Sequence, residues 1–516
     1  MRKVRILWTD DEIDLLKTYI IYLQEKGFDV TTANNGDDAI ELTKTQDFDL
    51  VFLDENMPGL SGLQVLEVIK SIKPELPVVM ITKSEEENIM DQAIGSKIAD
   101  YLIKPVNPKQ ILLTIKKNID TKRLISEKTL SDYQSEFGKL GIKISEARTF
   151  ADWAELYKKL VYWEIELESD KESGMMDVFR MQKSDANLGF GKFIKKNYIQ
   201  WFSESEKPLM SPNLFKERIF PMIENGEKVF VILIDNLRFD QWKAIQPIIN
   251  EYFTVEQEEL YCSILPTATQ YARNAIFAGL MPLEIDKNYP QYWLNDEEEG
   301  GKNLKEKELF ETYLKRLGKD YKFYYEKISL HKSGEKLVEN VNDLMHNHIN
   351  ILIYNYIDML SHARTESEMI RELANDESAY RSVTVSWFKH SPLFSLIKEL
   401  HHHKVKIVIT TDHGTVKVTN PIKVIGDKNT TTNLRYKNGR SLNYNPNEVF
   451  EIRQPEKAHL PKSNISTSYI FATNNDFMAY PNNFSHYANY YKNTFQHGGI
   501  SMEEMIIPFI KLKPNI

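Results

Sequence analysis

The sequence is almost without cysteine. Its 516 residues include one, Cys262, so the chain can form neither an internal disulfide nor a zinc site built from thiolates. Any metal must therefore be held by histidine and carboxylate groups. The scarcity of cysteine also favours a reducing compartment, and we expect the protein in the cytoplasm.

Long hydrophobic runs are absent too. The apolar stretch near the N-terminus ends at Trp8 and is followed directly by Asp10 and Asp11, so it lacks the core of a signal peptide. The run from Val229 to Ile234 is far shorter than the roughly 20 residues that cross a bilayer. We therefore expect no export signal and no membrane span.

Positive charge is in deficit, with 65 lysines and arginines against 74 acidic residues and a net charge of -9. This balance argues against non-specific wrapping of nucleic acid, because the phosphate backbone attracts basic surfaces. The length exceeds that of one ordinary core, and about 100 to 200 residues per domain predicts three or so domains.

Residues 1–120 alternate short apolar runs with stretches of helical spacing. The runs are Val4 to Trp8, Val30 to Thr32, Leu50 to Leu53, Val78 to Ile81 and Tyr101 to Ile103. This alternation predicts an α/β domain with a parallel sheet covered on both faces, whose functional groups gather where the strands end. Those ends carry Asp10, Asp11, Asp54, Thr82 and Lys104.

Three aspartates beside one lysine would repel each other unless a hard cation such as Mg²⁺ lay among them. Asp54 would then act as a nucleophile for phosphoryl transfer, with Lys104 and Thr82 contacting the phosphoryl oxygens. The alternative is that these are ordinary strand-end and capping residues.

The set Asp10-Asp11, Asp54-x-x-Met57-Pro58-Gly59, Thr82, Tyr101 and Lys104-Pro105 resembles the receiver domain of bacterial response regulators. The resemblance implies a flavodoxin-like fold and phosphorylation of Asp54. It also implies Mg²⁺ bound by Asp10, Asp11, Asp54 and the backbone of Asn56, and a switch formed by Thr82, Tyr101 and Lys104. Lys83 departs from the pattern, because receivers usually carry a small residue there.

Residues 121–210 lack strand signals. Proline is absent until Pro208, and Phe150, Trp153, Leu156, Leu160 and Trp163 recur at helical spacing, which predicts a helical bundle. No helix-turn-helix signature with a basic face is evident, which disfavours a DNA-binding output. The bundle is either a rigid connector or a lever or dimerisation element.

In residues 211–516, three hydrophobic strands are expected to end in acids. The runs Val229–Ile234, Ile351–Ile357 and Val405–Thr411 precede Asp235, Asp358 and Asp412. Histidines follow at His362 and His413, and His497 lies in a glycine-flanked loop. Imidazole and carboxylate are what Zn²⁺ takes without thiolates, and two ions about 3.5 to 4 Å apart can clamp a phosphate ester. Thr267 or Thr269 could supply the nucleophile.

This set resembles the alkaline phosphatase superfamily, in particular its PglZ branch, in Asp235-Asn-Leu-Arg-Phe-Asp240 and His497-Gly-Gly-x-Ser-x-Glu-Glu-Met. The resemblance implies one zinc held by Asp358, His362 and His497, and another held by Asp235, Asp412 and His413. It makes Thr269, in Pro-Thr-x-Thr, the nucleophile. Spacing alone nominates Arg238 and Arg273 as contacts for the substrate phosphate.

Together the three parts, 1–120, 121–210 and 211–516, resemble response regulators associated with type IX secretion. That resemblance implies a partner sensor histidine kinase, a link to a sigma factor or secretion components, and phosphodiesterase activity on nucleotide or oligonucleotide substrates. A receiver also implies a phosphorylation-dependent homodimer. The alternative class is a catalytically silent, metal-containing docking platform, in which Thr269 would have no role.

Overall fold

The computed structural model describes residues 3–83, 98–168, 174–366, 368–374, 376–426 and 430–515. The chain divides into two compact units, Met1–Asp132 and Tyr133–Ile516, and helix α5 (Pro108–Glu146) contains the boundary. In the described ranges, no helix combines the length and the apolar character that a bilayer crossing requires.

The first unit is built on a five-stranded parallel sheet of order β2-β1-β3-β4-β5. Its strands are β1 (Arg5–Thr9), β2 (Asp29–Ala33), β3 (Leu50–Asp54), β4 (Val78–Thr82) and β5 (Asp100–Ile103). All five predicted strands are present. Strand β3 is buried along its whole length because it pairs with β1 on one side and β4 on the other.

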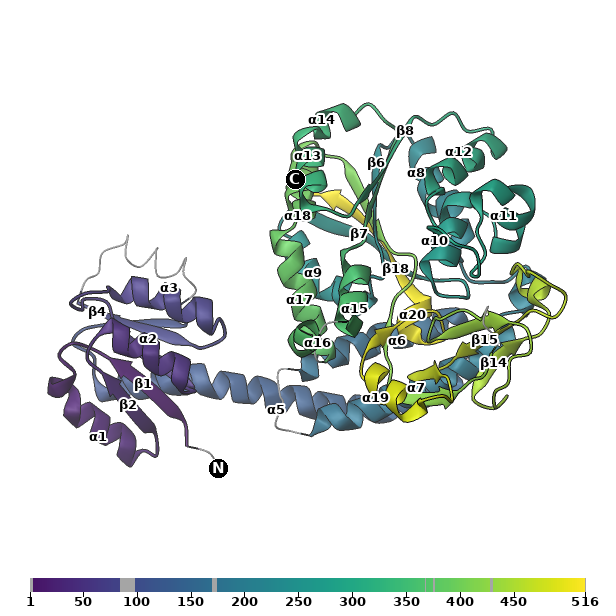
Figure 1. Ribbon diagram of the computed structural model, residues 1–516. Coiled ribbons are helices and arrows are strands. Elements are labelled where there is room, and N and C mark those ends of the chain that lie inside the picture. Colours follow the sequence, from purple (N-terminus) through teal and green to yellow (C-terminus); the bar gives the residue numbers. More distant parts are fainter. Residues whose placement is uncertain are drawn as a thin grey trace. The chain divides into compact units, whose positions relative to one another are not determined.

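Helices cover both faces of this sheet, as Figure 1 shows. They are η1 (Ile13–Leu16), α1 (Lys17–Glu25), α2 (Gly36–Thr45), α3 (Gly62–Ile72) and the start of α5. Ala39, Val65 and Ile69 of α2 and α3 belong to one core cluster, whereas Leu23 and Ile111 of α1 and α5 belong to the other. This is the α/β fold that the sequence predicts.

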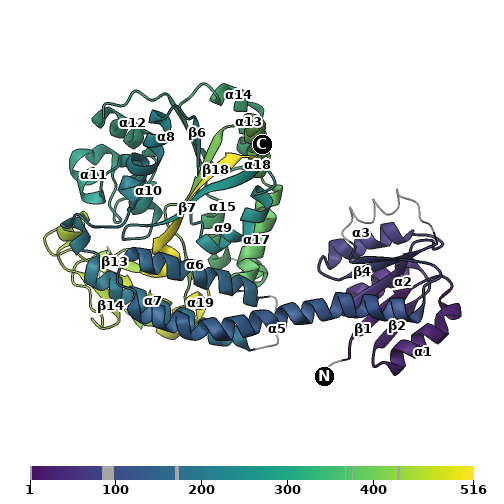
Figure 2. The ribbon, with the colours of Figure 1, turned by 180° about the vertical axis from the view of Figure 1, so that it is seen from behind.

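The second unit begins with helices, namely the end of α5 followed by α6 (Phe150–Leu167) and α7 (Met175–Asn197). The predicted apolar positions Trp153, Leu156 and Leu160 are buried, and Trp153 packs against Phe190 with ring centroids 5.6 Å apart. Figure 2 shows α6 and α7 side by side. The prediction of a helical region is confirmed.

The rest of the second unit is built on a six-stranded sheet of order β7-β18-β10-β6-β9-β8. The strands are β6 (Val229–Ile234), β7 (Phe253–Cys262), β8 (Phe323–Ile328), β9 (Ile349–Tyr354), β10 (Lys406–Thr410) and β18 (Ile506–Pro514). Strands β10, β6, β9 and β8 run parallel, while β18 is antiparallel to both β10 and β7. The carboxyl ends of β6, β9 and β10 therefore share one edge.

Helices flank this sheet on both sides, with α8, α10, α11 and α12 on one side and α9, α17 and α18 on the other (Figures 1 and 2). Their bounds are α8 (Phe220–Glu224), α9 (Phe239–Ile249), α10 (Thr269–Ala278), α11 (Pro282–Asn288), α12 (Glu306–Arg316), α13 (His331–Glu339), α14 (Val341–Leu344), α15 (Tyr356–Glu366), α16 (Glu368–Leu373), α17 (Glu377–His390) and α18 (Pro392–His402). Short helical turns are η2 (Gln200–Phe202), η3 (Ser211–Asn213), η4 (Phe215–Ile219), η5 (Pro290–Tyr292) and η6 (Pro455–Ala458). The central strands β6 and β9 are buried along their whole length, whereas β7 and β8 at the edges are partly accessible.

Three small sheets lie between β10 and β18 in the sequence. They comprise β11 (Val416–Lys417) with β17 (Phe495–Gln496), β12 (Asn420–Lys423) with β16 (Asp476–Ala479), and β13 (Tyr436–Gly439), β15 (Ser468–Ala472) and β14 (Val449–Ile452). Helix α19 (Phe484–Tyr491) precedes β17, and α20 (Met502–Met505) leads into β18. This region delivers the loop that carries His497.

One expected strand is shorter than predicted. The run Ile351–Ile357 was expected to continue to Asp358, but β9 ends at Tyr354 and Asp358 lies in the first turn of α15. Asp358 and His362 are therefore one helical turn apart on the same face of α15, which brings their side chains together.

Candidate functional site

The receiver-like pocket lies where the strands of the first sheet end. Asp54 is the last residue of β3, and Asp10 and Asp11 follow β1 directly. Carboxylate oxygens of these three residues lie within 4.8 Å of one another. Lys104 follows β5, and its Nζ lies 2.8 Å from Asp10 Oδ2 and 3.0 Å from Asp54 Oδ1. The structure thus brings the four predicted pocket residues together.

The electrostatics of this pocket oppose the charged form of Asp54. Burial raises the pKa of the Asp54 carboxyl, the nearby Asp10 raises it further, and the hydrogen bond from Lys104 acts in the opposite direction. Burial disfavours the charged form of Lys104, but its bonds to Asp10 and Asp54 outweigh that effect and raise its pKa. A divalent cation would relieve the repulsion between the carboxylates.

The other predicted receiver residues lie in or shortly after the strands that carry the pocket. Thr82 is the buried last residue of β4, Tyr101 is half-buried in β5, and Asn56 is exposed two residues after Asp54. Lys83, the residue that departs from the receiver pattern, is exposed. Its Nζ forms an ion pair with Glu12 Oε2 at 3.4 Å. The described contacts therefore pair Lys83 with a surface carboxylate.

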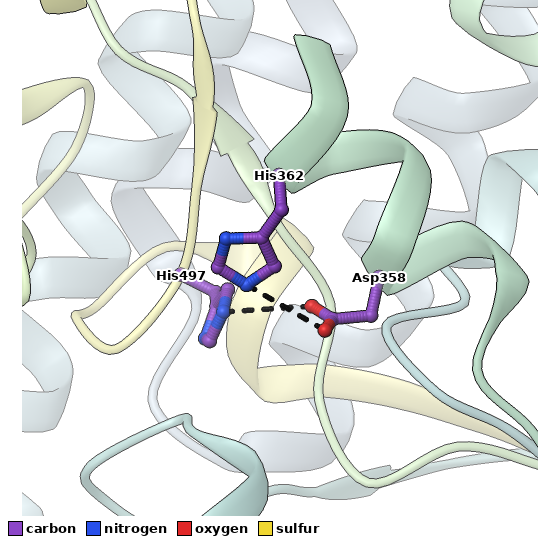
Figure 3. Close-up of side chains that lie close together, drawn as sticks. All are labelled: Asp358, His362 and His497. Atoms are coloured by element: carbon purple, nitrogen blue, oxygen red, sulfur yellow. Dashed lines mark ion pairs between the residues drawn. The ribbon is translucent and has the colours of Figure 1, made fainter. Parts of the chain in front are cut away.

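The second site is at the shared strand edge of the larger sheet. Asp358, His362 and His497 form one group, in which one potential ligand atom from each lies within 4.8 Å of the others. Figure 3 shows the two histidines directed toward the Asp358 carboxylate, with His362 Nε2 at 3.5 Å and His497 Nε2 at 3.7 Å from its oxygens. Helix α15 supplies two of these residues, and the loop after β17 supplies the third.

Asp235, Asp412 and His413 form the other group, by the same 4.8 Å criterion, and all three are buried. Asp235 follows β6, and Asp412 and His413 follow β10. The rings of His413 and His497 stack with centroids 4.3 Å apart and an interplanar angle of 16°. The two groups are therefore neighbours, divided as the sequence resemblance implies.

The donor set of the second site fits metal ions. Asp412 Oδ2 is buried and has no hydrogen-bond donor among the described residues. Burial and the neighbouring Asp412 raise the pKa of Asp235 well above its usual value. Burial and the neighbouring His413 lower the pKa of His497 to about 3, and burial lowers that of His413. Neutral imidazoles beside crowded carboxylates are the ligands that Zn²⁺ takes.

Of the two candidate threonines, Thr269 faces the metal-ligand residues. Its hydroxyl lies 3.1 Å from His413 Nε2 and 3.4 Å from Asp235 Oδ1, at the N-terminus of α10. The Thr267 hydroxyl is buried, donates to the Gly499 carbonyl at 2.9 Å and accepts from the Gly498 N–H at 3.0 Å. Thr267 thus fastens the His497 loop, which leaves the Thr269 hydroxyl as the one beside the ligands.

The two arginines nominated as phosphate contacts, Arg238 and Arg273, pair with different carboxylates. Arg273 reaches the site, with its guanidinium 2.7 Å from Asp235 Oδ2, 2.6 Å from Glu306 Oε1 and 3.9 Å from Asp412 Oδ2. The guanidinium of Arg238 is buried and pairs with Asp240 and Glu377. Contact between Arg238 and a substrate phosphate stays a prediction.

Two site residues were not anticipated. Asn236, at a left-handed φ of 66°, directs its backbone N–H to Asp412 Oδ1 and its side-chain amide to Asp358 Oδ1, both at 3.3 Å. Its position directly after a strand-end aspartate could have indicated a turn, because asparagine adopts the left-handed conformation more readily than most residues. Glu306 of α12 is fully buried against Arg273 and Lys327, and nothing in its local sequence indicates this role.

Glycine is required where two loops of the site meet. A Cβ atom at Gly414, directly after His413, would overlap the carbonyl oxygen of Glu503. The Gly414 N–H also donates to the Glu504 carbonyl at 3.2 Å. The backbone after β10 and the backbone of α20 are therefore in direct contact.

Models of three protein families match the chain in succession. The response regulator receiver domain matches residues 6–116, the PorX response regulator linker domain matches 123–202, and the BREX system PglZ alkaline phosphatase-like domain matches 214–512. The last match alone covers more than half of the chain.

Similar individual proteins share the N-terminal part. The alginate biosynthesis regulator AlgB of Pseudomonas syringae pv. tomato is 37% identical over 120 residues, which is 23% of this chain and 27% of that protein. ResD of Bacillus subtilis is 32% identical over 114 residues, 22% of this chain and 47% of its own. The chain thus spans between about a quarter and a half of the length of these relatives.

The solved structures similar to the chain include a response regulator and a receiver domain protein. Response regulator TrrA of Thermotoga maritima, solved with Mg²⁺ and BeF, is 31% identical, with 22% of this chain and 97% of that chain covered and a TM-score of 0.21. A CheY-like receiver protein of Methanospirillum hungatei is 25% identical, with 23% and 96% covered and a TM-score of 0.23.

The sequence of domains agrees with the geometry of both sites. The receiver match contains the carboxylate pocket, and the PglZ match contains both groups of metal-ligand residues and Thr269. The chain belongs to the PglZ alkaline phosphatase-like family, in the form of a PorX-like response regulator that joins a receiver domain to a PglZ domain.

Proposed function

We propose that the chain is a two-component response regulator in which phosphorylation of Asp54 controls a zinc-dependent phosphodiesterase acting on nucleotide-type diesters. The observation that carries the proposal is the meeting of two neighbouring groups of metal-ligand side chains, with the Thr269 hydroxyl beside Asp235 and His413 of one of them. We propose functional boundaries at 1–120, 121–210 and 211–516, close to the three family matches.

In the receiver, a phosphodonor such as a sensor kinase transfers its phosphoryl group to a carboxylate oxygen of Asp54. The new P–O bond forms as the donor's bond to phosphorus breaks. Lys104, 3.0 Å from Asp54 Oδ1, is in reach to pair with the phosphoryl oxygens. Asp10, Asp11 and Asp54, with the backbone of Asn56, would hold Mg²⁺, which neutralises the charge that gathers there.

In the PglZ domain, Asp358, His362 and His497 would hold one zinc, and Asp235, Asp412 and His413 the other. When bound, zinc would activate the nucleophile and stabilise the charge that develops on the phosphate. The Thr269 oxygen attacks phosphorus, one ester oxygen departs and takes up a proton, and water then releases the phosphate monoester from Thr269. Arg273 and Asn236 hold the carboxylates of Asp235, Asp412 and Asp358 in place.

The wider setting follows from the family. We propose a sensor histidine kinase as phosphodonor, a phosphorylation-dependent homodimer, and an output that reaches a sigma factor or type IX secretion components. These partners rest on the likeness to PorX-like regulators.

The test is hydrolysis of bis(p-nitrophenyl) phosphate by wild type and Thr269→Ala, with zinc content determined for both. We expect the variant to keep its zinc and lose at least about a thousandfold in turnover, because the nucleophile is removed. Thr312→Ala is the matched control, since within the described part of the chain the Thr312 hydroxyl donates to Leu309 of its own helix and to no other residue.

If the wild type binds zinc and does not exceed the buffer rate, with or without receiver phosphorylation, the enzyme proposal fails. The metal domain would then be a docking platform for a regulator or secretion component. In that case Thr269→Ala would leave partner binding unchanged.

A further inference from the structure

The loop that carries His497 is fastened on the side that faces Thr267. The Thr267 carbonyl lies 3.1 Å from His497 Nδ1, and its hydroxyl bonds both glycines that follow. The Glu504 carboxylate accepts from the Gly499 N–H at 2.8 Å and from Arg435 at 2.6 Å. Residues 497–504 therefore act as one hydrogen-bonded segment that ends in α20.

The other end of this segment is held by the linker bundle. Asn187 of α7 accepts a hydrogen bond from the Met502 N–H at 2.8 Å and donates one to Glu503 Oε2 at 2.9 Å. Asn187 is 2% exposed, so water cannot replace either bond readily. Asn187 thus bonds two consecutive residues of the segment, although it is more than 300 residues away from them in sequence.

A charge pair reinforces this contact one turn earlier on α7. Lys183 Nζ lies 3.0 Å from Glu503 Oε1 and 2.9 Å from Glu164 Oε2 of α6. The side chains of Glu164 and Glu503 are almost fully buried. Moving α7 away would leave carboxylates buried without their cation, which is strongly unfavourable.

Helix α7 is itself fixed within the bundle. Gln182 accepts a hydrogen bond from the buried Tyr133 hydroxyl of α5 at 3.1 Å and donates to the Phe137 carbonyl at 2.9 Å. The contact therefore continues from α5 through α7 to the segment that contains His497. Each link is a direct hydrogen bond or ion pair within the second unit.

We infer that Asn187 and Lys183 are positioning residues for His497, so that the linker bundle is a working part of the metal site rather than a spacer. This inference rests on the proposed function in so far as His497 is a zinc ligand. It assigns the linker a regulatory consequence, because a shift of α7 alters how firmly His497 is presented to the metal.

The experiment compares full-length wild type, Asn187→Ala and the matched control Asn197→Ala. Asn197 is also on α7, but among the residues that the structure describes its side chain bonds only the Phe193 carbonyl of its own helix. The first readout is amide hydrogen exchange of peptides covering 495–505 in metal-free protein. The second is zinc affinity by chelator competition, together with the visible spectrum of the Co²⁺-substituted protein.

In Asn187→Ala we expect faster exchange at the peptides covering 495–505 and about tenfold weaker binding of one zinc, with an altered Co²⁺ spectrum. Asn197→Ala should match wild type in all three measurements. Glu503→Ala removes the bond from Asn187 and the ion pair with Lys183 from the loop side, and keeps the Met502 bond. It should change the same measurements in the same direction, which guards against a folding defect peculiar to one variant.

Wild-type exchange and wild-type zinc affinity in either folded variant would overturn the inference. Absence of zinc binding in wild type would instead defeat the proposed function. The exchange comparison in metal-free protein would still decide whether Asn187 positions the segment.

Discussion

The two carboxylate clusters of this chain are balanced by different side chains. In the receiver, three aspartates meet one lysine, no imidazole belongs to the metal-ligand group and Asp11 is exposed. In the PglZ domain, three aspartates meet three histidines and the buried Arg273. Each cluster has one exposed member, Asp11 in the receiver and His362 in the PglZ domain, so the ligand types are what separates them. Oxygen ligands beside a lysine suit Mg²⁺ and a phosphoryl group that comes and goes, whereas imidazoles beside carboxylates suit zinc.

The sharpest separation of the two clusters should come from zinc removal. We expect 1,10-phenanthroline to reduce diester hydrolysis to the buffer rate, because the imidazole-containing groups lose their metal. Phosphorylation of Asp54 by acetyl phosphate in excess Mg²⁺, read on a phosphate-affinity gel, should be unchanged. Added zinc should restore hydrolysis. Hydrolysis that continues in the presence of the chelator would contradict the claim that the second cluster depends on zinc.

The buried Arg273 of the second cluster should contribute more to stability than an arginine that is paired at the surface. Arg273→Ala leaves the buried Asp235 without its arginine and leaves Glu306 with Lys327 as its cation, and we expect metal-free protein to lose about 3–5 kcal/mol of unfolding free energy. Urea unfolding followed by tryptophan fluorescence measures this. Arg453→Ala is the control, because that exposed arginine pairs at the surface with Glu451 and its loss should leave the unfolding free energy nearly unchanged. Equal losses in both variants would contradict the argument.

The smallest expected effect is that of receiver phosphorylation on the activity of the second cluster. Beryllofluoride with Mg²⁺ mimics phosphorylated Asp54, and we expect it to shift the chain toward a dimer and to change zinc-dependent turnover about fivefold. Light scattering and initial rates measure the two effects. Asp54→Asn should respond in neither measurement. Indifference of the wild type in both would mean that the clusters work independently.

Much of the fold was predictable because its signals are local. The strands of the receiver and the strands before Asp235 and Asp412 are short apolar runs, and parallel strands deliver their ends to one edge. The end of β9 was misplaced because Ile357 continues the apolar run, although it already belongs to α15. Periodicity cannot separate the last residues of a buried strand from the first turn of a buried helix.

The supports of the second site were beyond prediction from local pattern. Lys183, Asn187 and Glu306 are polar residues in helices, and such residues usually face solvent. Their burial depends on contacts between segments far apart in sequence, as in the bond from Asn187 to Glu503. Arg238 shows the reverse case, in which a basic residue near Asp235 in sequence is committed to Asp240 and Glu377.

The contact at Gly414 limits how such a sequence can drift. Because any side chain there would occupy the space of the Glu503 carbonyl, a substitution at 414 can be accepted only if α20 shifts, and α20 is joined both to the His497 loop and to α7. Variation in the loop after β10, in α20 and in the linker is therefore not independent. A chimaera that takes its linker from a homologue would therefore have to take its PglZ domain from the same homologue.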